Sequence, residues 1–172
     1  MEESIVNKVA QSGIITLDLS EWLREELFSS IDLKNQLWQE LALKEKDFRS
    51  WVKEHDWEQY TNHHVNLFCS VDAIVPVWAY MLVASKLQKY AATVTKGTQK
   101  AQRLAAIEHL LRLRKADFED ARVVVKGRND GDVPSEAYPM VVTILQAHVK
   151  SIMFGEPCST VPVYKKPRIP KS

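Results

Sequence analysis

The sequence predicts an α/β fold, in which a single domain holds a mainly parallel sheet with helices packed on it as a three-layer sandwich. The chain has 172 residues, enough for one domain with a substantial core, and 45% of them are hydrophobic. Strand-like and helix-like segments alternate from residue 64 onward with short connections. Such alternation is typical of parallel sheets, because a helix joins each strand to the next. No linker interrupts residues 1–164, which form the predicted domain.

The first sixty residues carry weaker signals. Gly13–Leu19 is predicted to be a strand, because Ile and Thr favour extended structure. The apolar positions in Leu33–Leu41 fit a helical stripe, with β-structure over part of that region as the alternative. Leu43–His55 is predicted to be a helix, since its apolar residues fall on one face.

The remaining elements follow from short apolar runs and helical spacing. The predicted strands are His64–Cys69, Ala92–Thr95, Arg122–Lys126 and Ser151–Gly155. The predicted helices are Ala73–Tyr90, one around Leu104–Leu111 and one that ends near Val149. The last of these begins either near Pro134, with a kink, or only around Pro139. Residues 165–172 are expected to be a mobile basic tail, with contact to an acidic partner as the less favoured alternative.

The pattern D-x-x-V-P-x-x-A-Y occurs twice, over Asp72–Tyr80 and Asp130–Tyr138, each time after a predicted strand. Strand-to-helix junctions of a parallel sheet lie at its carboxyl edge, where ligands bind. Helix initiation explains the Asp and Pro positions, because Asp caps a helix and Pro fits its first turn. The repeated Ala and Tyr have two explanations. We favour close packing of helix on sheet, and the alternative is that the two tyrosines form the walls of one pocket.

Two cysteines stand near predicted strand ends, and each is followed by a serine. A thiol near the amides of a helix N-terminus has a lowered pKa and is a better nucleophile or metal ligand. Free cysteine also packs as a small hydrophobe, and we favour that interpretation for Cys69. Cys158 lies in a polar segment, where packing and a functional role explain it equally well, and it is the candidate nucleophile. The candidate ligand-binding residues are Cys69, Ser70, Asp72, Tyr80, Asp130, Tyr138, Glu156, Cys158, Ser159 and Thr160.

Composition and missing motifs exclude several classes of function. The 23 basic and 22 acidic residues leave a net charge of +1, which argues against a nucleic-acid partner. The apolar run Ala73–Ala84 is too short to span a membrane, and the start lacks the pattern of a secretory signal. We therefore expect a cytoplasmic protein with reduced thiols. No C-x-x-C pair, Walker loop or common hydrolase motif occurs, so a zinc site is poorly supported and the cofactor stays unknown.

Several phrases together resemble a bacterial family described as domain of unknown function 2480. They are Ile5–Val9, Ser12–Leu19, Leu43–Arg49, Cys69–Pro76, Trp78–Leu82 and Lys150–Pro162, and they extend over nearly the whole chain. The resemblance implies a small cytoplasmic protein of unassigned activity. Genes of this family often neighbour iron–sulfur cluster assembly genes, which implies protein partners in that process. Many relatives carry a cysteine directly after the glycine that here is Gly127. Because this chain has Arg128 there, a three-cysteine metal site would lack one ligand.

The leading hypothesis places the junctions 69–76, 128–134 and 156–162 at one edge of the sheet. There Cys158 and Cys69 would hold a sulfur or metal species, in an accessory or binding protein of sulfur or iron–sulfur cluster metabolism. One alternative is an enzyme that acts on a small molecule through a cysteine nucleophile. The other is a protein-interaction module with a contiguous apolar surface patch. The candidate aromatics for that patch are Trp22, Trp38, Trp51 and Trp57, most of which we expect to lie in the core.

Overall fold

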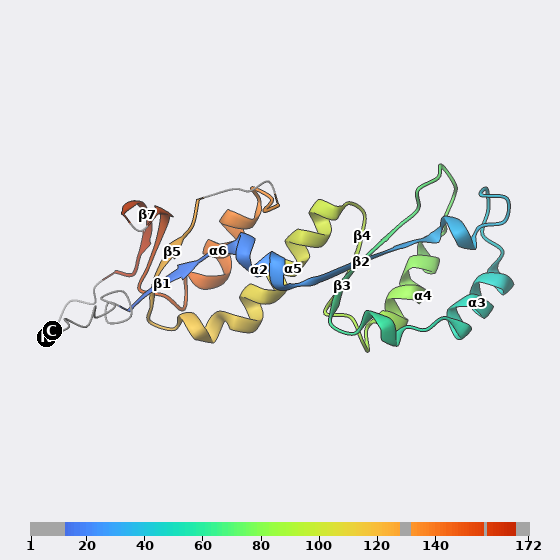
Figure 1. Ribbon diagram of the computed structural model, residues 1–172, viewed down its shortest axis with the longest axis horizontal. Helices are drawn as coiled ribbons and strands as arrows, with labels where there is room; N and C mark the ends of the chain where they lie inside the picture. Colours follow the sequence, from blue (N-terminus) through green and yellow to red (C-terminus); the bar gives the residue numbers. More distant parts are fainter. Residues whose placement is uncertain (1–12, 128–131, 157, 168–172) are drawn as a thin grey trace, which may run out of the picture. The chain divides into compact units, whose positions relative to one another are not determined.

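A computed structural model describes residues 13–127, 132–156 and 158–167 (Figure 1). Over these residues the chain is α/β with mostly parallel strands, as predicted. The strands form two sheets, however, and not the single sheet that the sequence suggested. The chain divides into two compact units: unit 1 comprises Met1–Leu23 and Leu110–Ser172, and unit 2 comprises Arg24–His109.

Unit 2 is built on a three-stranded parallel sheet with the order β2-β3-β4. Its strands are β2, Leu27–Asp32, β3, His63–Phe68, and β4, Thr93–Lys96. Side chains alternate between the two faces of a strand. His64 and Asn66 therefore face one side of the sheet, and Val65 and Leu67 face the other.

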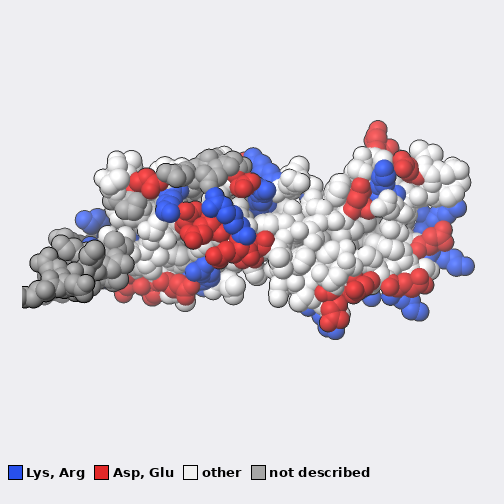
Figure 2. All heavy atoms as spheres, in the orientation of Figure 1, with Lys and Arg blue, Asp and Glu red and all other residues white. Residues whose placement is uncertain are grey.

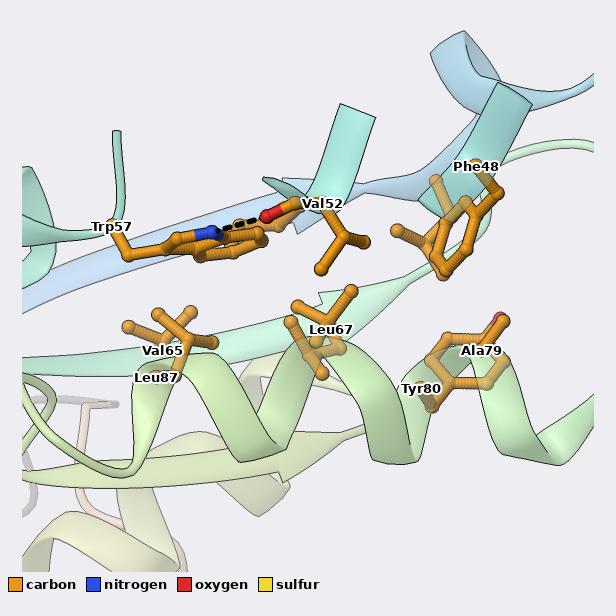
Figure 3. Packing of buried hydrophobic residues seen from close by; sticks show 11 residues of the cluster. Phe48, Val52, Trp57, Val65, Leu67, Ala79, Tyr80 and Leu87 are labelled. Carbon is orange, nitrogen blue, oxygen red and sulfur yellow. Dashed lines mark hydrogen bonds between the residues drawn. The ribbon is translucent and has the colours of Figure 1, made fainter. Parts of the chain in front are cut away.

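Two helices cover the face that carries Val65, and together they form the core of unit 2 (Figure 3). They are α3, Glu45–Glu54, and α4, Val77–Leu87. Inside this core the indole N–H of Trp57 donates to the carbonyl oxygen of Val52 at 2.9 Å, so that its polar group is satisfied. The buried residues of the core are Ile31, Leu33, Phe48, Val52, Trp57, Val65, Leu67, Ala79, Tyr80, Val83 and Leu87.

The opposite face of this sheet is covered by the first part of α5, Gln99–Arg114, of which the residues up to His109 belong to unit 2. The buried side-chain amide of Gln102 donates to the carbonyl oxygens of Ser29, at 2.8 Å, and His64, at 2.6 Å. The ring of His109 lies 5.9 Å from that of His64. Unit 2 therefore has three layers, helix, sheet and helix, as the sequence predicted.

Unit 1 holds a four-stranded sheet with the order β1-β5-β6-β7. Its strands are β1, Ile14–Leu17, β5, Arg122–Val125, β6, Ser151–Glu156, and β7, Ser159–Lys165. The first three are parallel, and β7 runs antiparallel to β6. Helix α6, Ala137–Leu145, packs on the face of Val125 and Ile152, because these residues line an apolar pocket together with Val141.

Short helical segments complete the fold. Helix α2, Leu19–Glu25, begins after Asp18, whose carboxylate accepts hydrogen bonds from the amides of Ser20 and Glu21, each at 3.1 Å. The ring of Trp22 on α2 packs against that of Phe118, with 6.1 Å between the ring centroids. The 3-10 helices are η1, Leu33–Gln36, η2, Glu58–Tyr60, and η3, Lys115–Phe118.

The predicted start of α4 at Ala73 is wrong by several residues, whereas α6 begins between the two starts predicted for it. Asp72 does not cap α4, which begins only after Pro76, and α6 begins after Glu136. Asp130 lies outside the described residues. The alanines of the two repeats, Ala79 and Ala137, are both 0% exposed, which agrees with close packing of helix on sheet.

The third predicted junction is wrong in kind. This segment does not lead from a strand into a helix, because Glu156 ends β6 and Ser159 begins the antiparallel strand β7. The first residues predicted as a mobile tail also belong to the sheet. Lys165 is the last residue of β7, and the amide of Lys166 donates to the carbonyl oxygen of Lys150 at 2.9 Å. Among the described residues, no helix has the length and apolarity needed to cross a membrane.

Candidate functional site

The carboxyl ends of β2, β3 and β4 meet at one edge of the unit 2 sheet, because the three strands are parallel. This edge is where α/β proteins most often bind ligands. Polar side chains from each strand end and from the first turn of α4 gather there. We call this group the edge cluster. Its members are Asp32, Cys69, Ser70, Tyr80 and Lys96.

Asp32 ties two strand ends together. Its carboxylate accepts hydrogen bonds from the backbone amides of Lys34, at 3.0 Å, and Ser70, at 3.1 Å. Partial burial acts to raise the pKa of Asp32, but the hydrogen bonds from Ser70 and Lys34 outweigh it and hold that pKa below its usual value. The edge cluster therefore contains a carboxylate that stays negatively charged at neutral pH.

Tyr80 forms the inner wall of the edge cluster and is only 9% exposed. Burial raises the pKa of its hydroxyl above the usual value, and the charges of Cys69 and Asp32 raise it further. The ammonium nitrogen of Lys96 lies 4.9 Å from the centre of the Tyr80 ring, within range of a cation–π contact. A protonated phenol and a cation thus stand on the same side of the cluster.

Cys69 directly follows β3 and is a free, half-buried thiol. Its sulfur donates to the carbonyl oxygen of Val71 at 3.5 Å. The sequence predicted a helix N-terminus close to this thiol. Helix α4 begins only at Val77, however, eight residues after Cys69. His63 and His64 lie at the opposite end of β3 from Cys69, as predicted.

An exposed apolar surface adjoins the edge cluster. It is formed by the loops that follow β2 and β3 and by the first turns of α4, and we call it the edge patch. Isolated β-bridges join Ala42 to both Trp38 and Ile74, which places these two loops side by side. The surface over the first loop is largely uncharged at the upper right of Figure 2. The exposed fractions are 49% for Trp38, 63% for Leu41, 87% for Ile74, 70% for Val77 and 66% for Met81.

Unit 1 carries a related arrangement at the carboxyl ends of β1 and β5. The ammonium of Lys126 contacts the carboxylate of Asp18 at 3.0 Å. Burial raises the pKa of Tyr138, and the charge of Asp18 adds to the effect. Tyr138 and Tyr80 are the last residues of the two sequence repeats, and each lies near an aspartate from a neighbouring strand end. The tyrosines therefore occupy similar surroundings, each within its own unit.

The other predicted site residues of unit 1 lie along the β6–β7 hairpin. Tyr138 packs its ring against Phe154, with 5.5 Å between the ring centroids. Glu156 pairs with Ser159, Thr160 approaches the sulfur of Met153 at 3.8 Å, and Cys158 is exposed in the turn. Cys69 follows a strand of one sheet, and Cys158 lies between two strands of the other. The prediction that both cysteines stand at the edge of a single sheet is therefore wrong.

A family model described as "Protein of unknown function (DUF2480)" matches residues 3–166 of the chain. The chain belongs to the DUF2480 family. The resemblance drawn from the sequence phrases is therefore confirmed. No curated protein and no solved structure matches the chain significantly.

Metal-ligating side chains are sparse in this DUF2480 protein. No three His, Cys, Asp or Glu side chains gather closely enough to hold a metal ion within residues 13–127, 132–156 and 158–167. In the edge cluster Cys69 and Asp32 supply two such groups, and a mononuclear site generally needs more.

Sequence reasoning missed Asp32 and Lys96, the two charged members of the edge cluster. Asp32 was missed because β2 was not recognised as a strand, and with it the adjacent strand end. The signal for Lys96 was available, since it directly precedes Gly97, which ends the predicted strand. Asp72, by contrast, was predicted for the site, but it lies exposed in the loop between β3 and α4.

Proposed function

We propose that this chain is a cytoplasmic accessory protein of sulfur or iron–sulfur cluster metabolism that binds its ligand at the edge cluster of unit 2. The observation that carries the proposal is the position of Cys69, a reduced thiol at the carboxyl edge of a parallel sheet beside Asp32 and Tyr80. The association with sulfur chemistry rests on the family resemblance. The geometry supports a binding site at this edge.

Each member of the edge cluster would have a separate part in such binding. The thiolate of Cys69 is the type of group that binds soft metal ions and sulfur species. The ammonium of Lys96 would attract a negatively charged ligand. The hydroxyl of Ser70 is hydrogen-bonded to Asp32 and would help to hold that carboxylate in place. Asp32 holds the Ser70 amide in place and so positions the thiol-bearing loop. Partner proteins would supply or receive the bound species.

Two serine substitutions test this proposal. The protein is purified from cells without oxygen, and bound metal and sulfide are measured per chain. The wild-type protein and Cys158→Ser should retain both, whereas Cys69→Ser should lose most of both. Cys158 is the matched control, because it is also a free thiol but lies exposed in a hairpin turn of unit 1. A wild-type protein without metal and sulfide, or equal losses in the two variants, would contradict the proposal.

A second candidate function, protein interaction, is favoured by the edge patch. Of the four tryptophans considered for such a surface, Trp57 is buried at 7% exposure, whereas Trp38 is 49% exposed within the edge patch. Single exposed apolar residues are common on protein surfaces, but five large exposed side chains on two adjoining loops and the helix that follows favour a binding surface. The interpretation also fits an accessory protein, since a partner on the edge patch would lie close to Cys69.

Charge introduced into the edge patch should weaken partner binding. In a cross-linking experiment in cells, the Ile74→Asp variant should capture few of the proteins that cross-link to the wild-type chain. The reason is that an aspartate must be desolvated in an apolar interface. Leu113→Asp serves as control, since Leu113 is 68% exposed and belongs to unit 1, whereas the patch residues belong to unit 2. Identical cross-linked proteins with Ile74→Asp and wild type would eliminate this candidate.

A further inference from the structure

A hollow of about 740 Å³ lies on unit 1, on the sheet and at the edge where its parallel strands begin. The first residues of β1, β5 and β6 line it together with the end of β7. This place is the opposite edge from the one that carries Asp18 and Lys126. Its volume falls in the range of pockets that hold small organic ligands, roughly 300–1,000 Å³. The hollow is therefore large enough for a ligand of nucleotide size.

Four basic side chains line the hollow: Arg122, Lys150, Lys165 and Lys166. The backbone fixes their spacing. The amide of Lys150 donates to the carbonyl oxygen of Ala121 at 2.7 Å, and that of Lys166 donates to the carbonyl oxygen of Lys150 at 2.9 Å. The cations thus stand on neighbouring, hydrogen-bonded strand ends, not on a flexible tail.

Strand register places two of these cations on either side of a hydroxyl. Ser151 pairs with Arg122 of β5 on one side and with Lys165 of β7 on the other. Residues paired in this way share a face of the sheet, with neighbouring strands about 4.8 Å apart. An oxyanion above Ser151 would accept a hydrogen bond from its hydroxyl and lie between the guanidinium and the ammonium.

Among the residues that the structure describes, few acids compensate the charge of the hollow. Among the four basic side chains, Lys166 forms an ion pair with Asp120 at 3.8 Å within the described residues, and both of these side chains are exposed to solvent. The chain as a whole carries a net charge of only +1, so the basic character is local. Electrostatic complementarity therefore selects an anion.

The rest of the lining is apolar. Met153 and Pro162 pair with each other in the second row of the same sheet face, and Ile14 pairs with Arg122 on that face. An inorganic anion would leave these side chains without a partner, whereas an aromatic or aliphatic body would pack against them. We propose that this hollow binds a small organic phosphate, with its phosphate on Arg122, Ser151 and Lys165 and its apolar body on Met153 and Pro162.

Naphthyl phosphate is a suitable probe, because it combines one phosphate with one aromatic body. Its binding to the full chain is measured by calorimetry, with naphthol and inorganic phosphate as the two separate parts. Naphthyl phosphate should bind at least about tenfold more tightly than either part, and added salt should weaken that binding. Equal affinities for naphthyl phosphate and inorganic phosphate would overturn the proposal, as would no binding of naphthyl phosphate.

Two variants of equal charge change locate the site. The double variant Arg122→Glu with Lys165→Glu should weaken binding at least about tenfold. The double variant Lys46→Glu with Lys53→Glu changes two exposed lysines on α3 of unit 2 and should leave the affinity within about twofold. Circular dichroism checks that each variant is folded. If the first variant unfolds, Lys165→Gln with Lys166→Gln replaces it, and unchanged binding in a folded variant would refute this location.

Discussion

Replacing Phe48 by alanine is expected to lower the free energy of unfolding of unit 2 by about 3–5 kcal/mol. Phe48 is 1% exposed in the core of unit 2 (Figure 3). Its ring lies 5.4 Å from that of Trp51 and 5.8 Å from that of Trp78. Removal of the ring deletes these contacts and leaves a cavity between α3 and the sheet, because the surrounding backbone relaxes only partly. Denaturant unfolding followed by tryptophan fluorescence measures the loss.

Met81→Ala is the matched control for this substitution. Met81 is also a large apolar residue of unit 2, but it is 66% exposed on α4. Its replacement should change the free energy of unfolding by no more than about 0.5 kcal/mol. A Phe48→Ala variant as stable as Met81→Ala would show that α3 does not pack on the sheet as described.

The stability of unit 2 is expected to fall as the pH is lowered through about 6.5, because of His64. This side chain is 0% exposed, with its Nδ1 2.8 Å from the hydroxyl of Thr93 and its Nε2 3.0 Å from the carboxylate of Glu26. Burial lowers the pKa of His64 below its usual 6.5, and the charges of His109 and His63 lower it further, against the opposing effect of Glu26.

The direction of the effect follows from proton binding. Between the lowered pKa of native His64 and 6.5, the unfolded chain binds a proton that the native chain does not. The stabilisation is therefore complete above pH 6.5 and is lost progressively below it, at no more than about 1.4 kcal/mol per pH unit for one proton. Unfolding free energies measured from pH 7.5 to 5.0 give this slope.

A His64→Gln variant should have a smaller slope over the same pH range. Some pH dependence should remain, since burial also lowers the pKa of His55. The variant should also be less stable at pH 7.5, because Glu26 and Thr93 lose the partner that the imidazole provided. Equal slopes in wild type and variant would assign the pH dependence to other groups.

The sequence predicted those elements whose local pattern is strong. Strand β5 contains a run of three valines, strand β3 carries Val65, Leu67 and Phe68, and the periodic apolar face of α3 lies where it was expected. Strand β2 was missed because its central residues Ser29 and Ser30 interrupt the apolar pattern. Strand β7 was missed because it contains Pro162, and proline is tolerated in a sheet only at an edge or a bulge.

The candidate site was predicted in part for the same reason. Cys69, Ser70 and Tyr80 were found because they follow a recognisable strand and its repeat. Asp32 could not be found without β2. The grouping of Cys69 with Cys158 assumed one continuous sheet, but strand order depends on long-range pairing that local patterns do not encode.

The distribution of tryptophans has a consequence for experiments on cooperativity. Of the five tryptophans, Trp22 lies in unit 1 and the others, Trp38, Trp51, Trp57 and Trp78, lie in unit 2. Intrinsic fluorescence therefore reports chiefly on one half of the molecule, whereas far-ultraviolet dichroism reports on both. Coincident melting curves from the two signals would mean that the halves lose their structure in a single transition. Separate curves would mean that a partner or ligand could stabilise one half without the other.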